Sequence, residues 1–374
     1  MQERAIGVAG LGTMGLGIAQ VYAAAGFRVL ATDALAQVRV TAHERLAKAL
    51  EPRVAAGKLS PEARDATLAN MVIVDTPEDL APADLVIEAI VEEMSAKRDL
   101  LMRIDSAMAR WAVLATNTSS LSVTELATNL AQPSRLVALH FFNPAPAMKL
   151  VELAAHRGTD PAAQALARRV TEAAGKTVIS CPDRPGFIVN RCARPYYGEA
   201  LALLEEGRNA AEIDAAMLAA GYKLGPFALI DLIGADVNLA ATESLGRAMN
   251  GNPRYHTFAA LRRQVASGQL GRKSCRGFIF PADPASAPAD SEAIALRIEA
   301  TLINEAGWLL AEGGVEPQGV DTAMRLGLNF PRGPFEALKH HGRFAVLKTL
   351  RELENTVPSH IAGRYRPAPF LEEE

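Results

Sequence analysis

The pattern of apolar residues at the start of the chain predicts a strand, a turn, a helix and a second strand. Residues 4–9 (RAIGVA) form a short apolar run that is typical of a buried strand. Residues 13–25 have apolar side chains at helical spacing, and Gly26 is a typical residue to end that helix. A second strand is expected at residues 28–33. This order is the unit from which parallel sheets are built.

The same alternation continues through the first half of the chain. Helical stretches separate further apolar runs that have the length and composition of buried strands, at residues 83–90, 113–117, 136–142, 148–153 and 177–180. Strands that alternate with helices indicate an α/β fold. We therefore expect a doubly wound, Rossmann-type sheet in a domain over residues 1–183.

The pattern of apolar residues changes near residue 183, from alternating strands and helices to helices alone. Pro185 and Gly186 are followed by long stretches of helical periodicity with little strand signal. A second boundary is expected in residues 281–290 (PADPASAPAD), because this composition is typical of a linker. Helical periodicity then resumes to about residue 355. The boundaries predict one helical domain at residues 184–282 and another at residues 290–374.

The two helical segments resemble each other. Three short matches occur in the same order at nearly constant offset: EALALLEEG at 199–207 with EAGWLLAEG at 305–313, IDAAM at 213–217 with VDTAM at 320–324, and GPF at 225–227 with GPF at 333–335. Such a run indicates a duplicated helical unit.

Composition and charge narrow the possible functions. A hydrophobic content of 49% is ordinary for a globular protein, and a net charge of −3 gives no reason to expect a nucleic-acid partner. The three cysteines include no CxxC pair, so neither a disulfide framework nor a metal site is expected. The uncharged run between Arg4 and Arg28 is long enough to imitate a membrane span, but its glycines argue against one. We expect a cytoplasmic protein without a membrane partner.

The turn after the first strand carries a GxGxxG motif, made of Gly10, Leu11, Gly12, Thr13, Met14 and Gly15. The first glycine makes the turn, the second lets the backbone approach a pyrophosphate, and the third lets the helix pack on the strand. Asp33 ends the next predicted strand, where a carboxylate accepts hydrogen bonds from the hydroxyls of an adenosine ribose. No arginine follows Asp33 directly, so the motif predicts NAD rather than NADP.

Polar residues at the carboxyl ends of the later strands are candidates for chemistry, because doubly wound sheets bind ligands at that edge. Residues 117–120 (NTSS) follow one strand, His140 lies in the next, and Glu152 lies in the strand after that. If the last two strands pair, His140 and Glu152 meet across the ladder. A histidine oriented by a carboxylate is a general base suited to alcohol oxidation. A histidine in an apolar strand is otherwise a core residue, and the spacing alone leaves both interpretations open.

Seven segments of the chain resemble the L-3-hydroxyacyl-CoA dehydrogenase family, in the order in which that family has them. They fall between residues 4 and 280 and read GLGTMGLGIAQ, VIEAIVEEMSAK, NTSSLS, HFFNPAPAMKLVE, PDRPGFIVNR, GYKLGPFALID and GRKSCRGF. The segment most specific to this family is HFFNP followed by MKLVE. The resemblance implies that His140 is the catalytic base and that Glu152 orients it. It also implies that Ser119 and Asn190 hydrogen-bond the substrate.

The resemblance further implies which residues bind the cofactor and coenzyme A. Family positions at or near the nicotinamide half of NAD are matched by Glu92, Lys97, Ser119, Asn143 and Lys273. Residues 35–64 hold six basic side chains against three acidic ones, where the family places a helical arm that contacts CoA. The candidates to bind CoA on this arm are Arg45, Lys48 and Lys58.

The chain departs from the short form of the family, which ends near residue 278. A second helical copy follows here, as in the long form at the end of multifunctional fatty-acid oxidation proteins. The enoyl-CoA hydratase half of those proteins is not expected, and Leu296 stands in the second copy where the first has Asn190, so no second active site is expected. We expect the second copy to pack on the first as a partner subunit would. The result would be a monomer with an internal pseudo-dimer, or a weak homo-oligomer.

These features predict the reversible oxidation of an L-3-hydroxyacyl-CoA to the 3-oxoacyl-CoA with NAD, a reaction of fatty acid metabolism and β-oxidation. Two alternatives stay open from the sequence: a dehydrogenase of a small hydroxy acid without CoA, and a non-catalytic NAD-binding protein on the same scaffold. The preferred acyl chain depends on the shape of the pocket, which the sequence does not give.

Overall fold

The computed structural model describes residues 5–282 and 285–373, and the chain falls into two compact units, Met1–Phe187 and Ile188–Glu374. Arg4, the first residue of the first predicted strand, lies outside the described residues, as do residues 283–284 of the predicted linker. None of the described helices is long and apolar enough to span a bilayer.

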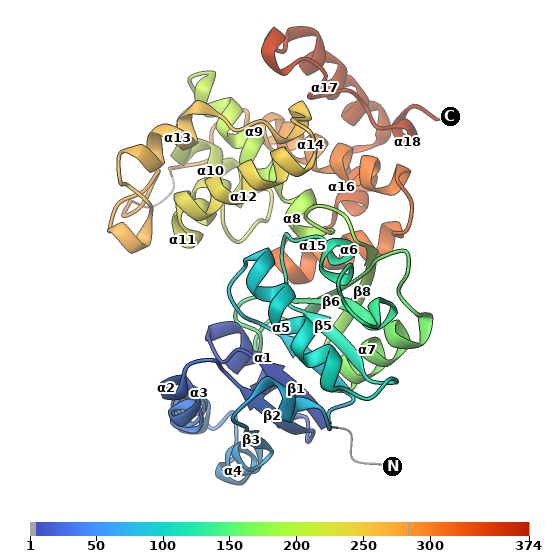
Figure 1. The fold of residues 1–374 in the computed structure, drawn as a ribbon. Coiled ribbons are helices and arrows are strands. Elements are labelled where there is room, and N and C mark those ends of the chain that lie inside the picture. Colours follow the sequence, from blue (N-terminus) through green and yellow to red (C-terminus); the bar gives the residue numbers. More distant parts are fainter. Residues whose placement is uncertain (1–4, 283–284, 374) are drawn as a thin grey trace. The chain divides into compact units, whose positions relative to one another are not determined.

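The first unit is built on an eight-stranded sheet with the order β3-β2-β1-β4-β5-β6-β7-β8 (Figure 1). The strands from β3 to β6 are parallel, β7 runs antiparallel to β6, and β8 is parallel to β7. The strand bounds are β1 Ala5–Ala9, β2 Arg28–Thr32, β3 Met71–Ile73, β4 Leu85–Glu88, β5 Val113–Thr116, β6 Leu136–Phe141, β7 Leu150–Ala155 and β8 Thr177–Pro182. This is the predicted Rossmann-type α/β fold.

Helices cover this sheet because its strands are apolar on both faces. Helices α1 and α7 pack on the same side, where the hydroxyls of Tyr22 and Thr171 lie 2.8 Å apart. Their apolar residues share one core cluster with alternate residues of the strands. The helices of this unit are α1 Thr13–Ala24, α2 Ala36–Val40, α3 Ala42–Ala55, α4 Pro61–Ala69, α5 Met94–Ala107, α6 Val123–Ala127 and α7 Pro161–Ala173, with 3-10 turns at Pro77–Leu80 and Pro133–Arg135.

The seven strands predicted in this region are all present, with ends that differ by one to a few residues. The predicted strand at 148–153 begins and ends two residues later, at Leu150–Ala155. The edge strand β3 was not predicted. Its three residues, Met71–Ile73, are too few to give a periodic signal, and only the pairing with β2 makes them a strand.

The second unit is helical, and no strand occurs among its described residues. Its helices are α8 Val189–Cys192, α9 Arg194–Glu205, α10 Ala210–Ala219, α11 Pro226–Ile233, α12 Ala235–Ala248, α13 Ala259–Ala266, α14 Ser291–Ala311, α15 Pro317–Leu328, α16 Pro334–His341, α17 Arg343–Thr356 and α18 Pro369–Glu372, with 3-10 turns at Pro253–Tyr255, Arg272–Ser274 and Ser359–Ile361. The repeated sequence segments fall in corresponding helices: α9 with α14, α10 with α15, and the start of α11 with that of α16.

Two equivalent ion-pair clusters join the copies within this unit. In one, Arg191 donates from Nε to Glu305 and from both Nη atoms to Glu312, at 2.7 Å each. In the other, Arg297 donates from Nε to Glu199 and from both Nη atoms to Glu206, at 2.6–2.7 Å. Each arginine therefore reaches from its own copy to a pair of glutamates in the other copy.

In each cluster the buried glutamate also contacts an arginine and the tyrosine that follows it, both from the other copy. Glu305 also accepts from Arg254 at 2.8 Å and from the Tyr255 hydroxyl at 2.5 Å. Glu199 lies 3.5 Å from Arg364 and accepts from the Tyr365 hydroxyl at 3.1 Å. Reciprocal contacts of this kind are the mark of a two-fold interface between like partners.

Candidate active site

Two glycines of the GxGxxG loop are required by close backbone approaches. A Cβ on Gly10, which has a φ of +98°, would lie 2.6 Å from the carbonyl oxygen of Ala89. A Cβ on Gly15 would lie 1.8 Å from the carbonyl oxygen of Gly10. A Cβ on Gly12 would have no neighbour within 4 Å, so the loop is open at the middle glycine. This is the arrangement in which a phosphate can approach the backbone.

The groups around this opening suit a dinucleotide. Gly12 is the N-cap of α1 and offers no side-chain acceptor, so the first backbone N–H groups of the helix, from Thr13 and Met14 on, stay available for a pyrophosphate. Asp33 follows β2, and its Oδ2 accepts a hydrogen bond of 2.7 Å from the N–H of Leu11. This bond holds the carboxylate beside the loop while each of its oxygens keeps a lone pair for a ribose hydroxyl. The residues present therefore fit NAD.

Two arginines donate hydrogen bonds to backbone carbonyl groups of the GxGxxG loop and of the neighbouring Asp33. Arg45 Nη1 donates to the carbonyl oxygen of Leu11 at 2.9 Å, and Arg39 Nη1 donates to that of Asp33 at 2.7 Å. Arg39 was not singled out from the sequence, because it follows Asp33 by six residues and only helix α2 brings it back. Lys48 and Lys58, the other predicted CoA contacts, are exposed.

A buried carboxylate that the sequence analysis missed lies at the end of β4. Glu88 is fully buried and accepts from the ammonium of Lys97 at 2.7 Å and from the hydroxyl of Thr116 at 2.6 Å. Lys97 is 1% exposed, so it is a buried cation and not a solvated surface charge. The signal for Glu88 was the acidic residue inside the apolar run VIEAI.

Glu92 organises the loop that follows β5. Its Oε1 accepts from the hydroxyl of Thr118 at 2.7 Å and from the backbone N–H groups of Ser119 and Ser120 at 2.8 and 3.1 Å. Burial acts to raise the pKa of Glu92, but these hydrogen bonds and the charge of Lys97 outweigh it and hold the pKa below its usual value. An ionised Glu92 therefore fixes the position of Ser119.

His140 and Glu152 meet as the spacing predicts. They face each other in the antiparallel register of β6 and β7, and His140 Nδ1 lies 2.6 Å from Glu152 Oε2. His140 is 6% exposed and Glu152 is fully buried. An ionised carboxylate only accepts hydrogen bonds, so this contact places the proton of the neutral imidazole on Nδ1 and leaves the lone pair on Nε2. A buried pair of this kind can accept a proton and stabilise the resulting charge.

Aromatic side chains and a backbone contact set the surroundings of His140. The ring of Phe142 lies 4.5 Å and that of Phe187 lies 6.0 Å from the imidazole, between ring centres. Asn117, at the end of β5, accepts from the N–H of Phe141 at 2.8 Å and ties the two strand ends together. His140 thus lies close to the carboxyl end of its strand, at the edge of the sheet that also carries the GxGxxG loop.

The other predicted site residues are Asn143 in the first unit and Asn190 and Lys273 in the second. Asn143 is exposed two residues after β6. Asn190 belongs to the second unit, in the short helix α8, as does Lys273, whose ammonium pairs with Asp236 at 2.5 Å. No group of three metal-ligating side chains occurs among the residues that the structure describes.

Family models match nearly the whole chain. The model for the 3-hydroxyacyl-CoA dehydrogenase NAD-binding domain matches residues 5–184, and the model for the C-terminal domain of the same enzymes matches residues 186–280 and again residues 294–373. The chain belongs to the 3-hydroxyacyl-CoA dehydrogenase family. It is accordingly an oxidoreductase, and its first unit is an NAD-binding domain.

Individual relatives agree with this membership. A 3-hydroxyadipyl-CoA dehydrogenase of Escherichia coli K12 is 33% identical, over 98% of this chain and 96% of its own length. The human mitochondrial hydroxyacyl-coenzyme A dehydrogenase is 38% identical, over 72% of this chain and 89% of its own. The crystal structure of a 3-hydroxybutyryl-CoA dehydrogenase from Escherichia coli K12 superposes with a TM-score of 0.92 at 31% identity, over 100% of this chain and 98% of that one.

Proposed function

We propose that this dehydrogenase oxidises the 3-hydroxyl group of an L-3-hydroxyacyl-CoA, with His140 as the general base. The observation that carries the proposal is the 2.6 Å contact between His140 Nδ1 and the buried carboxylate of Glu152. Oxidation of a hydroxyl requires a group that takes its proton as hydride leaves the adjacent carbon. In the reverse direction the protonated imidazole returns that proton to the 3-oxo group.

Glu152 has two effects on this proton transfer. It keeps the imidazole proton on Nδ1, so that Nε2 receives the proton from the substrate, and its charge stabilises the imidazolium that results. Both effects need a short contact in a site shielded from water, and the burial of the pair supports them.

The other predicted residues would bind and orient. Asp33 and the N–H groups of residues 10–15 would hold NAD, which would supply the hydride acceptor. Ser119 and Asn190 would hydrogen-bond the substrate oxygens, with Ser119 kept in place by Glu92. The residues that we propose to lie at or near the nicotinamide half of NAD are Glu92, Lys97, Ser119, Asn143 and Lys273.

Coenzyme A would be bound through cations on α3 and the turn that follows it. Lys48 and Lys58 are exposed and belong to the locally basic stretch 35–64, so they are free to meet phosphates. Arg45 is engaged with the GxGxxG loop, so its proposed contact with CoA would have to share the guanidinium with Leu11.

We propose further that the two helical copies form an internal pseudo-dimer, so that the chain is a monomer or a weak homo-oligomer. The reciprocal clusters around Glu199 and Glu305 support this arrangement. The predicted domains, 1–183, 184–282 and 290–374, are compatible with it, since the last two then share one compact unit. A cytoplasmic location is part of the proposal.

Two substrates separate this function from its main alternative. NADH oxidation is followed with acetoacetyl-CoA and with free acetoacetate at equal concentrations. The proposal predicts a kcat/KM for acetoacetyl-CoA that is higher by several orders of magnitude. Equal rates would favour a dehydrogenase of small hydroxy acids, and binding of NADH without turnover of either substrate would favour a non-catalytic protein.

A further inference from the structure

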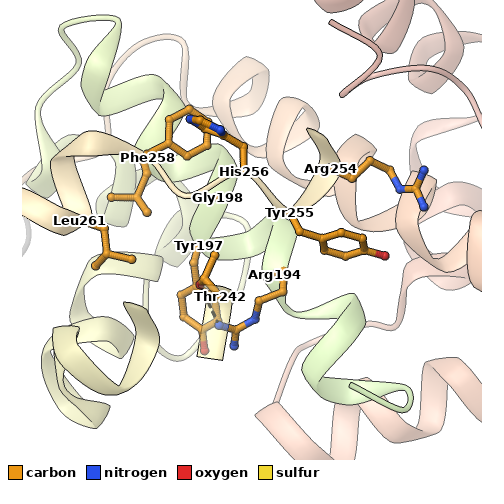
Figure 2. Close-up of a pocket in the computed structure, with 10 residues that line it drawn as sticks. Arg194, Tyr197, Gly198, Thr242, Arg254, Tyr255, His256, Phe258 and Leu261 are labelled. Atoms are coloured by element: carbon orange, nitrogen blue, oxygen red, sulfur yellow. Dashed lines mark hydrogen bonds between the residues drawn. The ribbon is translucent and has the colours of Figure 1, made fainter. Parts of the chain in front are cut away.

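Arg194, the first residue of α9, is a cation in the interior of the helical unit. It is 8% exposed. Its Nε donates to the carbonyl oxygen of Asn190 at 3.1 Å and its Nη1 donates to the hydroxyl of Thr242 at 3.2 Å. Figure 2 shows the guanidinium beside Thr242 and Tyr197, and it lies 4.9 Å from the centre of the Tyr197 ring.

The other buried arginines of the described chain each have a carboxylate, and Arg194 has none. Arg135 pairs with Asp105 at 2.6 Å, Arg191 with Glu305 at 2.7 Å and Arg364 with Glu199 at 3.5 Å. The contacts of Arg194 in the described residues are to neutral oxygens and an aromatic ring. Removal from water lowers its pKa, as expected for a buried cation without a counter-charge.

A second polar side chain near Arg194 is also unsatisfied. Asn238 is 1% exposed, and neither its Nδ2 nor its Oδ1 has a hydrogen-bond partner in the described residues. Asn238 lies one turn before Thr242 on α12, and the Thr242 hydroxyl donates to its carbonyl oxygen at 2.8 Å. Asn238 and Thr242 therefore share the helix face that meets Arg194. Buried polar groups without partners are rare, so we expect a ligand to supply the hydrogen bonds that the amide of Asn238 lacks.

We infer that Arg194, with Asn238 and Thr242, binds the distal carboxylate of a dicarboxylic 3-hydroxyacyl-CoA. A carboxylate supplies the missing counter-charge, and its two oxygens match the planar donors of a guanidinium and the amide of an asparagine. A neutral acyl end would leave the cation without a counter-charge and the buried amide of Asn238 without a hydrogen-bond partner.

The position of Arg194 relative to Asn190 supports a substrate rather than a free anion. The inference rests on the proposed function, in which Asn190 binds a substrate oxygen. Arg194 follows Asn190 by four residues, and its Nε donates to the carbonyl oxygen of Asn190, so the guanidinium lies beside the residue that is proposed to bind a substrate oxygen. Arg194 and Thr242 line a cavity of about 10 Å³, which has room for one water, so the carboxylate would need this space to widen (Figure 2).

The test compares two substrates that differ only at the far end, 3-oxoadipyl-CoA and 3-oxohexanoyl-CoA, with NADH as the reductant. The wild-type protein should have a higher kcat/KM for 3-oxoadipyl-CoA. Arg194→Met should lower the ratio of the two kcat/KM values by about tenfold to a hundredfold, the usual effect of losing hydrogen bonds to a charged group. Arg194→Lys should restore part of the ratio, and Asn238→Leu should lower it less than Arg194→Met.

Arg364→Met is the matched control, because it removes a buried arginine that already has a carboxylate partner. It should reduce the stability and leave the substrate ratio as in the wild type. A wild-type ratio near one, or an unchanged ratio in Arg194→Met, would overturn the inference, and the wild-type measurement does so even if a variant fails to fold. Activity on 3-oxohexanoyl-CoA without a preference for 3-oxoadipyl-CoA refutes only the carboxylate site. Absence of activity on both and on acetoacetyl-CoA would refute the proposed function itself.

Discussion

The paired ion clusters of the helical unit allow a stability effect to be separated from a catalytic one. Arg191, held by Glu305, follows Asn190 directly in the four-residue helix α8. Its counterpart Arg297, held by Glu199, follows Leu296 within the long helix α14. Glu305→Gln and Glu199→Gln therefore remove equivalent charges, but only the first affects a side chain next to a proposed substrate contact.

The structure gives the expected size of both effects. Glu305 is 1% exposed and Glu199 is fully buried, and removing one partner of a buried ion pair costs roughly 3–5 kcal/mol. We expect about 3 kcal/mol for each variant, because Arg191 keeps Glu312 and Arg297 keeps Glu206. For a unit of this size that loss lowers the melting temperature by roughly 6–12 °C. A small displacement of Asn190 should also lower kcat by about tenfold in Glu305→Gln.

Thermal unfolding and steady-state reduction of acetoacetyl-CoA at 20 °C measure the two effects on the same preparations. Both variants should melt earlier by similar amounts, and only Glu305→Gln should lose kcat. If the two variants lose kcat equally, Arg191 does not position Asn190. If neither variant is destabilised, the reasoning from buried charge is wrong.

Three further changes test the first unit. Gly15→Ala places a methyl group 1.8 Å from the carbonyl oxygen of Gly10, so it should raise the Kd for NADH by at least about tenfold in a fluorescence titration; unchanged affinity would contradict the proposed loop contact. Glu152→Gln keeps an acceptor for His140 but removes the charge, and stopped-flow assays should give a kcat lower by about a hundredfold or more, whereas a wild-type kcat would exclude its role. Glu92→Gln should reduce the stability at pH 7, and this effect should fade only below about pH 4.5, the pKa in the unfolded state. The pKa of Glu92 in the native state lies below that unfolded value, so its contribution is lost as the pH falls through the lowered pKa. Melting curves of both proteins at several pH values check this, and a difference that grows in acid would refute it.

The parts of the fold that could be predicted from the sequence are those with local or periodic signals. The GxGxxG loop and the buried strands follow from residue spacing, and so does the meeting of His140 with Glu152 once β6 and β7 pair. Strand β3 carries too short a signal, and it exists only through its pairing with β2.

Contacts between residues far apart in the chain could not be predicted in the same way. The links from Glu92 to Ser119 and from Glu88 to Thr116 depend on how strands β4 and β5 lie in the sheet. The reciprocal clusters of the helical unit depend on the packing of one copy on the other. Their glutamates lie within the repeated segments 199–207 and 305–313, but nothing local indicates which arginines they bind.

The role of His140 is tested most directly by His140→Asn, whose amide can still donate a hydrogen bond to Glu152 but cannot accept a substrate proton at neutral pH. NADH binding by fluorescence and single-turnover reduction of acetoacetyl-CoA are measured on the variant and the wild type. The proposed mechanism predicts an unchanged Kd for NADH and a rate of hydride transfer lower by about a hundredfold or more. A rate equal to that of the wild type would show that His140 is not the base.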